Sequence, residues 1–541
     1  MVTFADWVRS WSNKTPTAHA WWIDYQGELK SFSWQQIEQA VLKVAASFSE
    51  KGLVVGDRIV SQLPNSLSWA LIDLACNVLG LIHVPVDHRL PMSTLKQIVA
   101  TTRASLFQSV SDVFSIDSDK SSELGPSKNP DASIYEWSLA DPPHLDFERL
   151  RVAVEPNMTA CILFTSGTTG DPLGAMLSYD NLIQNAWGKL GALPQFSSDR
   201  RLNLLPFSHA YARTCELSTW ALTGGAMFCV QNIEQLRRLA SRFRPTLFNG
   251  VPHVFEKWMQ ELTVFQDIDR RHQAMIAMLG DSMRCLASGG AGLPPDVSRF
   301  FKQLGLPIIQ GYGLTEASPV VCSNRSDSPK TDSVGPPILN TELRIDDEQR
   351  LFVKGPGIMQ GYWENTEATH RRIHDGWLDT GDRAEKLPDG TLRILGRFDD
   401  RIVLSTGFKI DPMPIEQRLI KKLGMKHCML VGHNQRYVIA IVVTNLTNES
   451  ELLIAFQTQL ADLPDYCVPK HLIINDREWT EDRGLLNQKG NVRRKSVLEF
   501  YRNEIAAVYC SSFGRKQVAL NPSDCNKQDR NSNQDGNQIQ Q

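Results

Sequence analysis

Apolar runs of strand length alternate with helical segments through the first three-quarters of the chain. Residues 56–64 read GDRIVSQLP, and residues 66–86 read SLSWALIDLACNVLGLIHVPV. This pattern predicts a strand, a mostly apolar helix and a second strand, which is typical of a parallel sheet covered by helices. We therefore expect an α/β protein.

A stretch rich in charged and turn-forming residues, GRFDDRIVLSTGFKIDPMPI at 396–415, precedes a second set of elements. There, PIEQRLIKKL predicts a helix, and HCMLVGH and YVIAIVV predict strands. We therefore expect a large domain at residues 1–396 and a small domain at residues 397–514. Residues 515–541 are rich in Asn, Gln, Asp and Ser, and are expected to form a disordered tail. Residues 115–143 are expected to be a surface excursion of the large domain.

The charge, cysteine and histidine content of the chain argues against several functional classes. The chain has 57 basic and 60 acidic residues, a formal charge of -3, so no global field favours nucleic acid. Its polar start and the lack of a bilayer-length apolar run predict a cytoplasmic protein without an integral membrane segment. The ten cysteines form no CxxC pair and the twelve histidines no HExxH motif, which favours reduced structural thiols over a zinc site. Any metal is expected to arrive with a nucleotide.

A glycine- and hydroxyl-rich loop carries the strongest local signal. It lies in ACILFTSGTTGDPLGAMLSYDNLIQNAW, residues 160–187. Residues 161–164 predict a short strand, residues 166–174 a loop, and Ser178 the N-cap of a helix. Such a loop can wrap phosphates, because glycines permit close backbone approach and the N–H groups converge on an anion. It is not the GxxxxGK[ST] loop, and by itself it is equally compatible with a surface turn.

Further motifs follow in order: LPFSHAYART at 205–214, ASGGAGL at 287–293, QGYGLTEASP at 310–319 and GWLDTGD at 376–382. Together with the loop and the 396–416 segment, they resemble the adenylate-forming superfamily of acyl-CoA synthetases, luciferases and peptide-synthetase adenylation domains. The resemblance runs from about Trp7 to Tyr501. It implies a large N-terminal domain of helix-covered mixed sheets and a small mobile α+β C-terminal lid.

The resemblance also implies the ligands of ATP. Tyr312 would stack on the adenine, Thr315 and Glu316 would lie at the α-phosphate with Glu316 holding Mg²⁺, and Asp382 would accept the ribose hydroxyls with help from Arg397. As alternatives, Glu316 is a helix N-terminal acid, and Asp382 with Arg397 is a surface ion pair. The remaining nucleotide-site residues implied are Thr165, Ser166, Gly167, Thr168, Gly170, Gly174, Gly289, Gly290, Ala291, Gly311 and Gly313.

Four more roles follow from the resemblance. Thr169 would offer a hydroxyl to the phosphates, and His209 would lie at the entrance of the acyl pocket. The SHAYART segment resembles the fatty-acyl members, which points to an apolar acid. Asp399 matches the hinge, and Gly407 would line a passage for the pantetheine thiol of CoA. As alternatives, His209 is an ordinary hydrogen-bonded residue and Gly407 belongs to a simple turn.

The sequence departs from the family pattern at two positions, and both remove positive charge. The loop has Leu173 where the family has a lysine. Near the C-terminus, alignment on Gly490 puts Asn491 at the position of the lysine that reaches the α-phosphate. A shifted Lys489 would restore an ammonium there, although it can equally be a solvated surface lysine. Without such a contact, adenylation would slow by roughly a hundredfold or more.

These residues predict an ATP-dependent ligase that converts a carboxylic acid, by preference a fatty acid, to an acyl-adenylate and then to an acyl-CoA. One alternative acceptor is the phosphopantetheine of an acyl carrier protein. Another alternative is a catalytically weak nucleotide-binding and acyl-binding protein, because of Leu173 and Asn491. The sequence leaves open the acid, the acceptor, the oligomeric state and a peripheral association with membranes.

Overall fold

The computed structural model describes residues 1–25, 27–109, 145–166, 172–446, 448–487 and 490–511. The chain divides into two compact units, Met1–Asp399 and Asp400–Gln541. The predicted fold class is confirmed, since a large mixed α/β unit precedes a separate smaller one. The excursion expected at residues 115–143 and the tail expected at residues 515–541 lie outside the described residues.

The large unit contains an eight-stranded sheet whose six central strands run parallel and whose two edge strands, β13 and β2, pair antiparallel to their neighbours. Parallel strands buried on both faces need helices above and below. The spatial order is β13 (Val320–Ser323), β12 (Ile308–Gly313), β11 (Cys285–Ser288), β10 (Leu247–Gly250), β8 (Arg200–Asn203), β9 (Ala226–Cys229), β1 (His19–Tyr25) and β2 (Glu28–Ser33).

A six-stranded sheet carries the predicted strand–helix–strand unit. Its order is β16 (Gly361–Tyr362), β7 (Pro172–Ser178), β6 (Thr159–Ser166), β4 (Ile82–Val86), β3 (Arg58–Gln62) and β5 (Leu106–Ser109). Strands β3 and β4 are parallel, and α3 (Leu67–Leu79), which is buried along its whole length, joins them. The sequence prediction for this unit is therefore confirmed.

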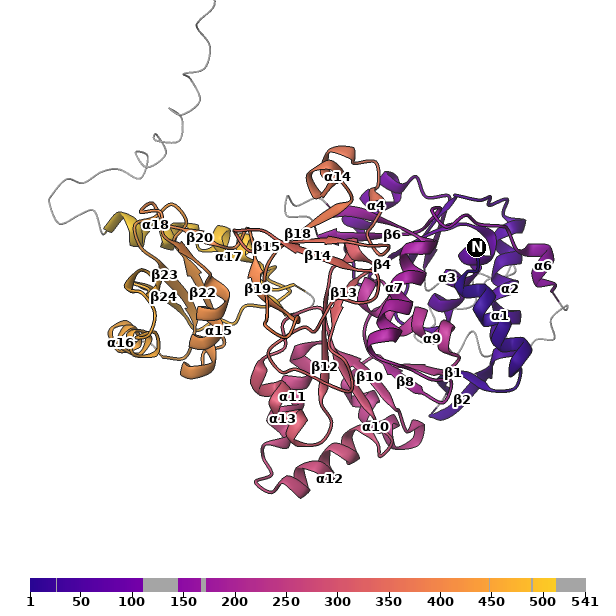
Figure 1. The fold of residues 1–541 in the computed structure, drawn as a ribbon, viewed down its shortest axis with the longest axis horizontal. Helices are drawn as coiled ribbons and strands as arrows, with labels where there is room; N and C mark the ends of the chain where they lie inside the picture. The colour runs from indigo at the N-terminus through magenta and orange to yellow at the C-terminus, as the bar shows by residue number, and fades with distance from the viewer. Residues whose placement is uncertain (26, 110–144, 167–171, 447, 488–489, 512–541) are drawn as a thin grey trace, which may run out of the picture. The chain divides into compact units, whose positions relative to one another are not determined.

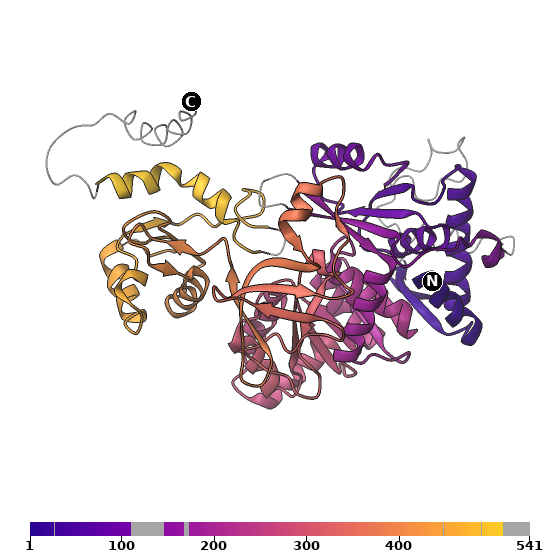
Figure 2. The ribbon, with the colours of Figure 1, turned by 45° about the horizontal axis from the view of Figure 1, so that its top comes forward.

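A third, antiparallel sheet completes the large unit. It consists of β14 (Glu342–Ile345), β15 (Arg350–Lys354), β18 (Trp377–Lys386), β17 (Ile373–His374) and β19 (Leu392–Arg397). Its long strand β18 contains the GWLDTGD motif from Trp377 onward, and β19 pairs with the end of β18. Helix α14 (Thr366–Arg372), orange in Figure 2, lies beside the six-stranded sheet and contacts its edge strand β16, which pairs with β7.

Helices cover the sheets of the large unit, and Figure 1 shows α10 to α13 grouped beside β8, β10 and β12. Ser178 caps α7 through a reciprocal capping box, as its sequence position predicts. Besides α3 and α14, the described helices of this unit are α1 (Phe4–Lys14), α2 (Trp34–Glu50), α4 (Met92–Thr102), α6 (Phe147–Leu150), α7 (Tyr179–Ala192), α8 (Ala210–Ala212), the π-helix η1 (Arg213–Ser218), α9 (Thr219–Thr223), α10 (Ile233–Phe243), α11 (Pro252–Leu262), α12 (Ile268–Leu279), α13 (Pro295–Gln303) and the 3₁₀-helix η2 (Thr315–Ala317).

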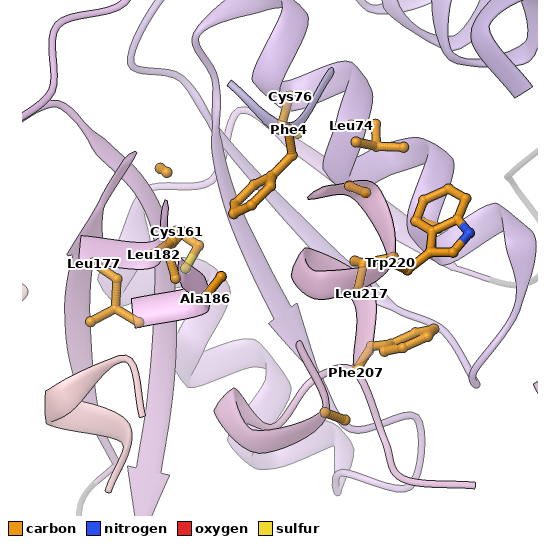
Figure 3. Close-up of a cluster of buried hydrophobic side chains, with 14 of the residues drawn as sticks. Phe4, Leu74, Cys76, Cys161, Leu177, Leu182, Ala186, Phe207, Leu217 and Trp220 are labelled. Carbon is orange, nitrogen blue, oxygen red and sulfur yellow. The ribbon is translucent and has the colours of Figure 1, made fainter. Parts of the chain in front are cut away.

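One apolar core joins the helices to the six-stranded sheet (Figure 3). Phe4, Leu74 and Trp220 come from three different helices and are each at most 2% exposed. Cys161 and Leu177 belong to the same cluster and come from β6 and β7, the two strands that flank the loop expected to bind phosphates, called the phosphate loop below. The core therefore fixes the strands on both sides of the loop.

The small unit has its own core. Strands β22 (His427–Val431), β23 (Ile439–Val443) and β24 (Leu472–Asn475) form one sheet, and β20 (Ile402–Val403) pairs with β21 (Lys409–Ile410). The predicted helix and both predicted strands are confirmed as α15 (Pro412–Leu423), β22 and β23. The remaining helices are α16 (Glu449–Gln459), the 3₁₀-helix η3 (Asp465–Cys467), α17 (Arg494–Phe500) and α18 (Arg502–Ser511). Throughout the described part of the chain, every helix is too short or too polar to span a bilayer.

Candidate nucleotide site

Tyr312, Asp382 and Arg397 come together from three strands, β12, β18 and β19. The Tyr312 hydroxyl donates to Asp382 Oδ2 at 2.6 Å, and Arg397 Nη1 donates to Asp382 Oδ1 at 3.0 Å. Asp382 is only 7% exposed, so it differs from the surface ion pair that the sequence left as an alternative. Burial raises the pKa of the Asp382 carboxyl, and Arg397 opposes that rise. The result is a buried, oriented carboxylate near the middle of β18.

Glu316 forms a second polar group on η2, which is separated from the end of β12 by Leu314. It is 7% exposed, and its Oε1 accepts a hydrogen bond from the Tyr362 hydroxyl at 2.8 Å. Arg372 Nη2 lies 3.9 Å from the same oxygen. Burial raises the pKa of the Tyr362 hydroxyl, and the nearby Glu316 raises it further. Tyr362 is therefore a neutral donor that orients the Glu316 carboxylate.

Thr380 connects the two polar groups. Its hydroxyl accepts from the Asp382 backbone N–H at 3.1 Å. Its carbonyl oxygen accepts from Arg397 Nη1 at 3.2 Å and from Arg372 Nη2 at 3.4 Å. The two carboxylates and the two guanidinium groups therefore share one region of the large unit.

Glycine is required where β12 and β13 approach each other closely. A Cβ at position 313 would lie 2.0 Å from the Pro319 carbonyl oxygen, and one at position 311 would lie 3.2 Å from the Cys322 carbonyl oxygen. Leu314 N donates to that Pro319 oxygen at 3.0 Å. These contacts hold Tyr312 on one side of the turn and η2, with Thr315 and Glu316, on the other.

The phosphate loop is described only at its ends. Thr165 and Ser166 pair with Leu173 and Pro172 at the ends of β6 and β7, and the Thr165 hydroxyl donates to the Leu173 carbonyl oxygen at 3.4 Å. A Cβ at Gly174 would lie 2.7 Å from the Ile162 side chain, which explains a glycine there. The predicted residues outside the described part of the chain are Gly167, Thr168, Thr169 and Gly170.

The SHAYART segment lies against the strand that carries the ASGGAGL motif. His209 is the residue before α8, and its backbone carbonyl accepts from Arg213 N at 3.0 Å. The Tyr211 ring packs on Gly289, where a Cβ would lie 2.9 Å from the ring. The predicted residues Gly290 and Ala291 follow in the turn after β11, with φ of +81° at Gly290. The segment assigned to the acyl pocket is therefore next to the segment assigned to the adenine.

A buried polar chain continues from Tyr211. Its hydroxyl lies 3.5 Å from Asn249 Oδ1, and Asn249 Nδ2 donates to Glu216 Oε1 at 2.7 Å. Glu216 lies on the π-helix η1 and is 1% exposed. Burial raises the pKa of its carboxyl to about 7, against the opposing charge of Arg201.

The remaining predicted residues belong to the junction and the small unit. Asp399 is the last residue of the large unit. Gly407, with φ of +86°, lies in the turn between β20 and β21, as the structural alternative expected. Asn491 is exposed, and its backbone N–H donates to Asn487 Oδ1 at 3.0 Å. Lys489 lies outside the described residues.

Two family models match the chain. The model described as AMP-binding enzyme covers residues 8–363, and the model described as AMP-binding enzyme C-terminal domain covers residues 399–512. The chain belongs to the adenylate-forming, AMP-binding enzyme family. The family prediction made from the motifs is thereby confirmed.

Several relatives of this AMP-binding enzyme are acid ligases. A long-chain-fatty-acid–CoA ligase, FadD15 of Mycobacterium bovis, is 27% identical over 85% of this chain and 89% of its own length. A feruloyl-CoA synthase of Amycolatopsis is 28% identical over 86% and 94%. A chloroplastic long-chain-fatty-acid–acyl-carrier-protein ligase of Arabidopsis thaliana, AEE15, is 24% identical over 88% and 82%.

The fold itself matches solved structures of this family. ATP-bound MatB of Rhodopseudomonas palustris superimposes with a TM-score of 0.75 at 22% identity, over 92% of this chain and 99% of that one. The O-succinylbenzoate CoA synthetase MenE of Bacillus subtilis, in complex with ATP and magnesium, gives a TM-score of 0.72 at 21% identity, over 90% and 98%. These likenesses show the fold of the AMP-binding enzyme.

The candidate site and its surroundings also contain residues that were not predicted from the sequence. Arg372 and Tyr362 contact Glu316, and Asn249 and Glu216 extend the polar chain from Tyr211. Arg372 lies four residues before the GWLDTGD motif, and an arginine so near a motif expected to bind a nucleotide is a usable signal. Nothing in the local sequence distinguishes Glu216 from a surface acid.

Proposed function

We propose that the protein activates a carboxylic acid with ATP and then transfers the acyl group to a thiol. The convergence of Tyr312, Asp382 and Glu316 within one unit carries this proposal. Asp382 presents a buried carboxylate to the two ribose hydroxyls, and Tyr312 presents its ring to the adenine. In this proposal Glu316 lies on the phosphate side of the ribose, and its hydrogen bond from Tyr362 and its proximity to Arg372 support that role.

A carboxylate oxygen of the acid would attack the α-phosphorus, and pyrophosphate would leave with the electron pair of the broken P–O bond. A thiolate would then attack the acyl carbon, and AMP would leave. Glu316 suits Mg²⁺, a hard cation that takes one or two protein carboxylates and completes its shell with phosphates and water. Within the described residues no group of three or more His, Cys, Asp and Glu could hold a metal by itself. When bound, the ion offsets charge on the phosphates.

We propose a fatty or other largely apolar acid as the substrate and CoA as the acceptor. The SHAYART segment and the relatives that act on long-chain fatty acids support this choice. The acyl-carrier-protein ligase among the relatives supports a carrier protein as a second candidate acceptor. The proposed roles of His209 at the acyl entrance, Asp399 at the hinge and Gly407 at the thiol passage belong to the same scheme.

The test is pyrophosphate release from ATP by the purified protein with acids of different chain length and with feruloyl-type aromatic acids. An acid-dependent signal should fall at least about a hundredfold in Glu316→Ala. The matched control is Glu342→Ala, which removes an exposed glutamate on β14 and should leave the rate unchanged. The acceptor is assigned by supplying CoA or a phosphopantetheinylated carrier protein.

Leu173 and Asn491 support a second candidate, a binding protein with weak or no adenylation. Silence with every acid, together with measurable AMP binding, would select this candidate over the ligase. Lys489→Ala should lower adenylation roughly a hundredfold if its ammonium replaces the lysine missing at Asn491. An unchanged rate in Lys489→Ala would remove Lys489 from the catalytic residues.

A further inference from the structure

Arg372, the last residue of α14, lies between the two carboxylates of the candidate site. Its Nη2 is 3.9 Å from Glu316 Oε1 and 3.4 Å from the Thr380 carbonyl oxygen. That carbonyl also accepts from Arg397, which pairs with Asp382. Arg372 therefore occupies the region where the proposed ribose position and the proposed phosphate position meet.

Gly381 lets two guanidinium groups converge on one short stretch of backbone. A Cβ there would lie 2.9 Å from Arg372 Nη1 and 3.0 Å from Arg397 Nη2, and its φ is +68°. Two like charges this close are unfavourable unless anions balance them. Glu316 and Asp382 provide part of that balance, and a phosphate is an anion that a planar guanidinium fork fits well.

Arg372 keeps its charge in this environment. Burial disfavours the charged form, but Glu316 and the Tyr362 hydroxyl outweigh burial, and the pKa of Arg372 rises above its ordinary value. Its neighbour Arg371 is different, because its side chain is 63% exposed and pairs with Glu367 on the same helix at 2.7 Å. Only the second of the two adjacent arginines of α14 is directed to the site.

We propose that Arg372 binds the α-phosphate of ATP and of the acyl-adenylate, and supplies the positive charge that the family takes from the lysine replaced here by Asn491. This inference rests on the proposed function. It assigns Arg372 as a catalytic residue, because its guanidinium would donate hydrogen bonds to the oxygens of the phosphate at which the reaction occurs. In this proposal the positive charge at the α-phosphate comes from the large unit, to which Arg372 belongs, and not from the small unit.

The experiment compares AMP with adenosine, which lacks only the phosphate, as ligands of the full-length protein. Arg372→Ala should weaken AMP binding at least about tenfold and adenosine binding less than about twofold, because a charge-assisted hydrogen bond is lost only with AMP. Arg372→Lys should give an intermediate AMP affinity. Arg371→Ala is the matched control and should bind both ligands as the wild type does. Calorimetry measures AMP, and ligand-observed NMR competition measures adenosine.

Circular dichroism establishes that each variant is folded, and Arg372→Gln replaces Arg372→Ala if the alanine variant unfolds. An Arg372 variant that binds AMP as tightly as the wild type overturns the inference and leaves the proposed function intact. An equal loss of AMP and adenosine affinity also overturns the inference, because the substitution would then weaken contacts with the nucleoside and not with the phosphate. A wild-type protein that binds neither ligand contradicts the proposed function itself.

Discussion

The Glu216 carboxyl group is buried, and among the described residues only one of its two oxygens accepts a hydrogen bond. Asn249 donates to Oε1, whereas Oε2 has no partner among the described residues. An ionised carboxylate in this position is costly, and burial raises the pKa to about 7 for that reason. Two hydrogen bonds, through Asn249, connect Glu216 to Tyr211, so its charge state bears on the region proposed to receive the acyl group.

Glu216 should make the large unit less stable as pH rises. Below the ordinary pKa of 4.5 the Glu216 carboxyl group carries its proton in both the folded and the unfolded chain. Above pH 4.5 the unfolded chain releases this proton first, so the free energy of unfolding falls until about pH 7. This difference corresponds to roughly 3 kcal/mol of unfolding free energy. Glu216→Gln should therefore gain stability relative to the wild type between pH 5 and pH 8 in urea unfolding. Glu342→Gln is the control, and a pH dependence in Glu216→Gln parallel to that of the wild type would contradict the assignment.

At the scale of elements, the turn from β12 through η2 to β13 brings together Tyr312, Thr315 and Glu316, three residues of the candidate nucleotide site. Tyr312 precedes the turn, Thr315 and Glu316 form it, and β13 returns antiparallel to β12. The turn is tight because Gly313 lies directly against the backbone of Pro319. This close contact fixes the separation between Tyr312, proposed to contact the adenine, and Glu316, proposed to lie at the phosphates.

Gly313→Ala should disrupt this turn. The added Cβ would meet the carbonyl oxygen of Pro319 at 2.0 Å, and backbone atoms cannot move aside as a flexible side chain can. We expect a loss of about 3 kcal/mol in unfolding free energy and a matching loss of AMP affinity. Gly292→Ala is the control, because a Cβ there meets no atom within 4 Å. Urea unfolding of both variants measures the difference, and equal stabilities would show that the turn is not under this constraint.

At the scale of the whole molecule, the large unit holds the described residues proposed to contact adenosine and the α-phosphate. Tyr312, Glu316, Arg372, Asp382 and Arg397 all precede the boundary at Asp399. The two units also have separate hydrophobic cores. The proposed nucleotide contacts therefore lie in one unit, whereas Asn491, at the position where the family resemblance implies a lysine, and Lys489, two residues earlier, belong to the other.

Residues 1–399 expressed alone should fold and bind AMP within about threefold of the full-length affinity, since the proposed contacts are complete within this unit. Calorimetry with AMP tests this, after circular dichroism has shown that the fragment is folded. A folded fragment without AMP affinity would show that the small unit supplies an essential contact. The same fragment should release no pyrophosphate with any acid if Lys489 takes part in adenylation.

The sequence by itself determined the fold class, the family and the elements with strong local patterns. The β3–α3–β4 unit, the Ser178 cap and the strands β22 and β23 follow from apolar periodicity and capping chemistry, which act between residues near in sequence. The ordered motifs identified the segments of the candidate nucleotide site for the same reason, since each motif is a local arrangement of glycine, hydroxyl and carboxylate groups.

Only the tertiary structure decided which side chains meet. Tyr312 reaches Asp382 across 70 positions, and Arg372 reaches Glu316 from a helix whose own pattern indicates nothing more than a charged surface. The burial that raises the pKa of Glu216 also depends on packing against elements far away in the chain. Long-range contacts of this kind are set by how sheets and helices pack, and no local pattern encodes them.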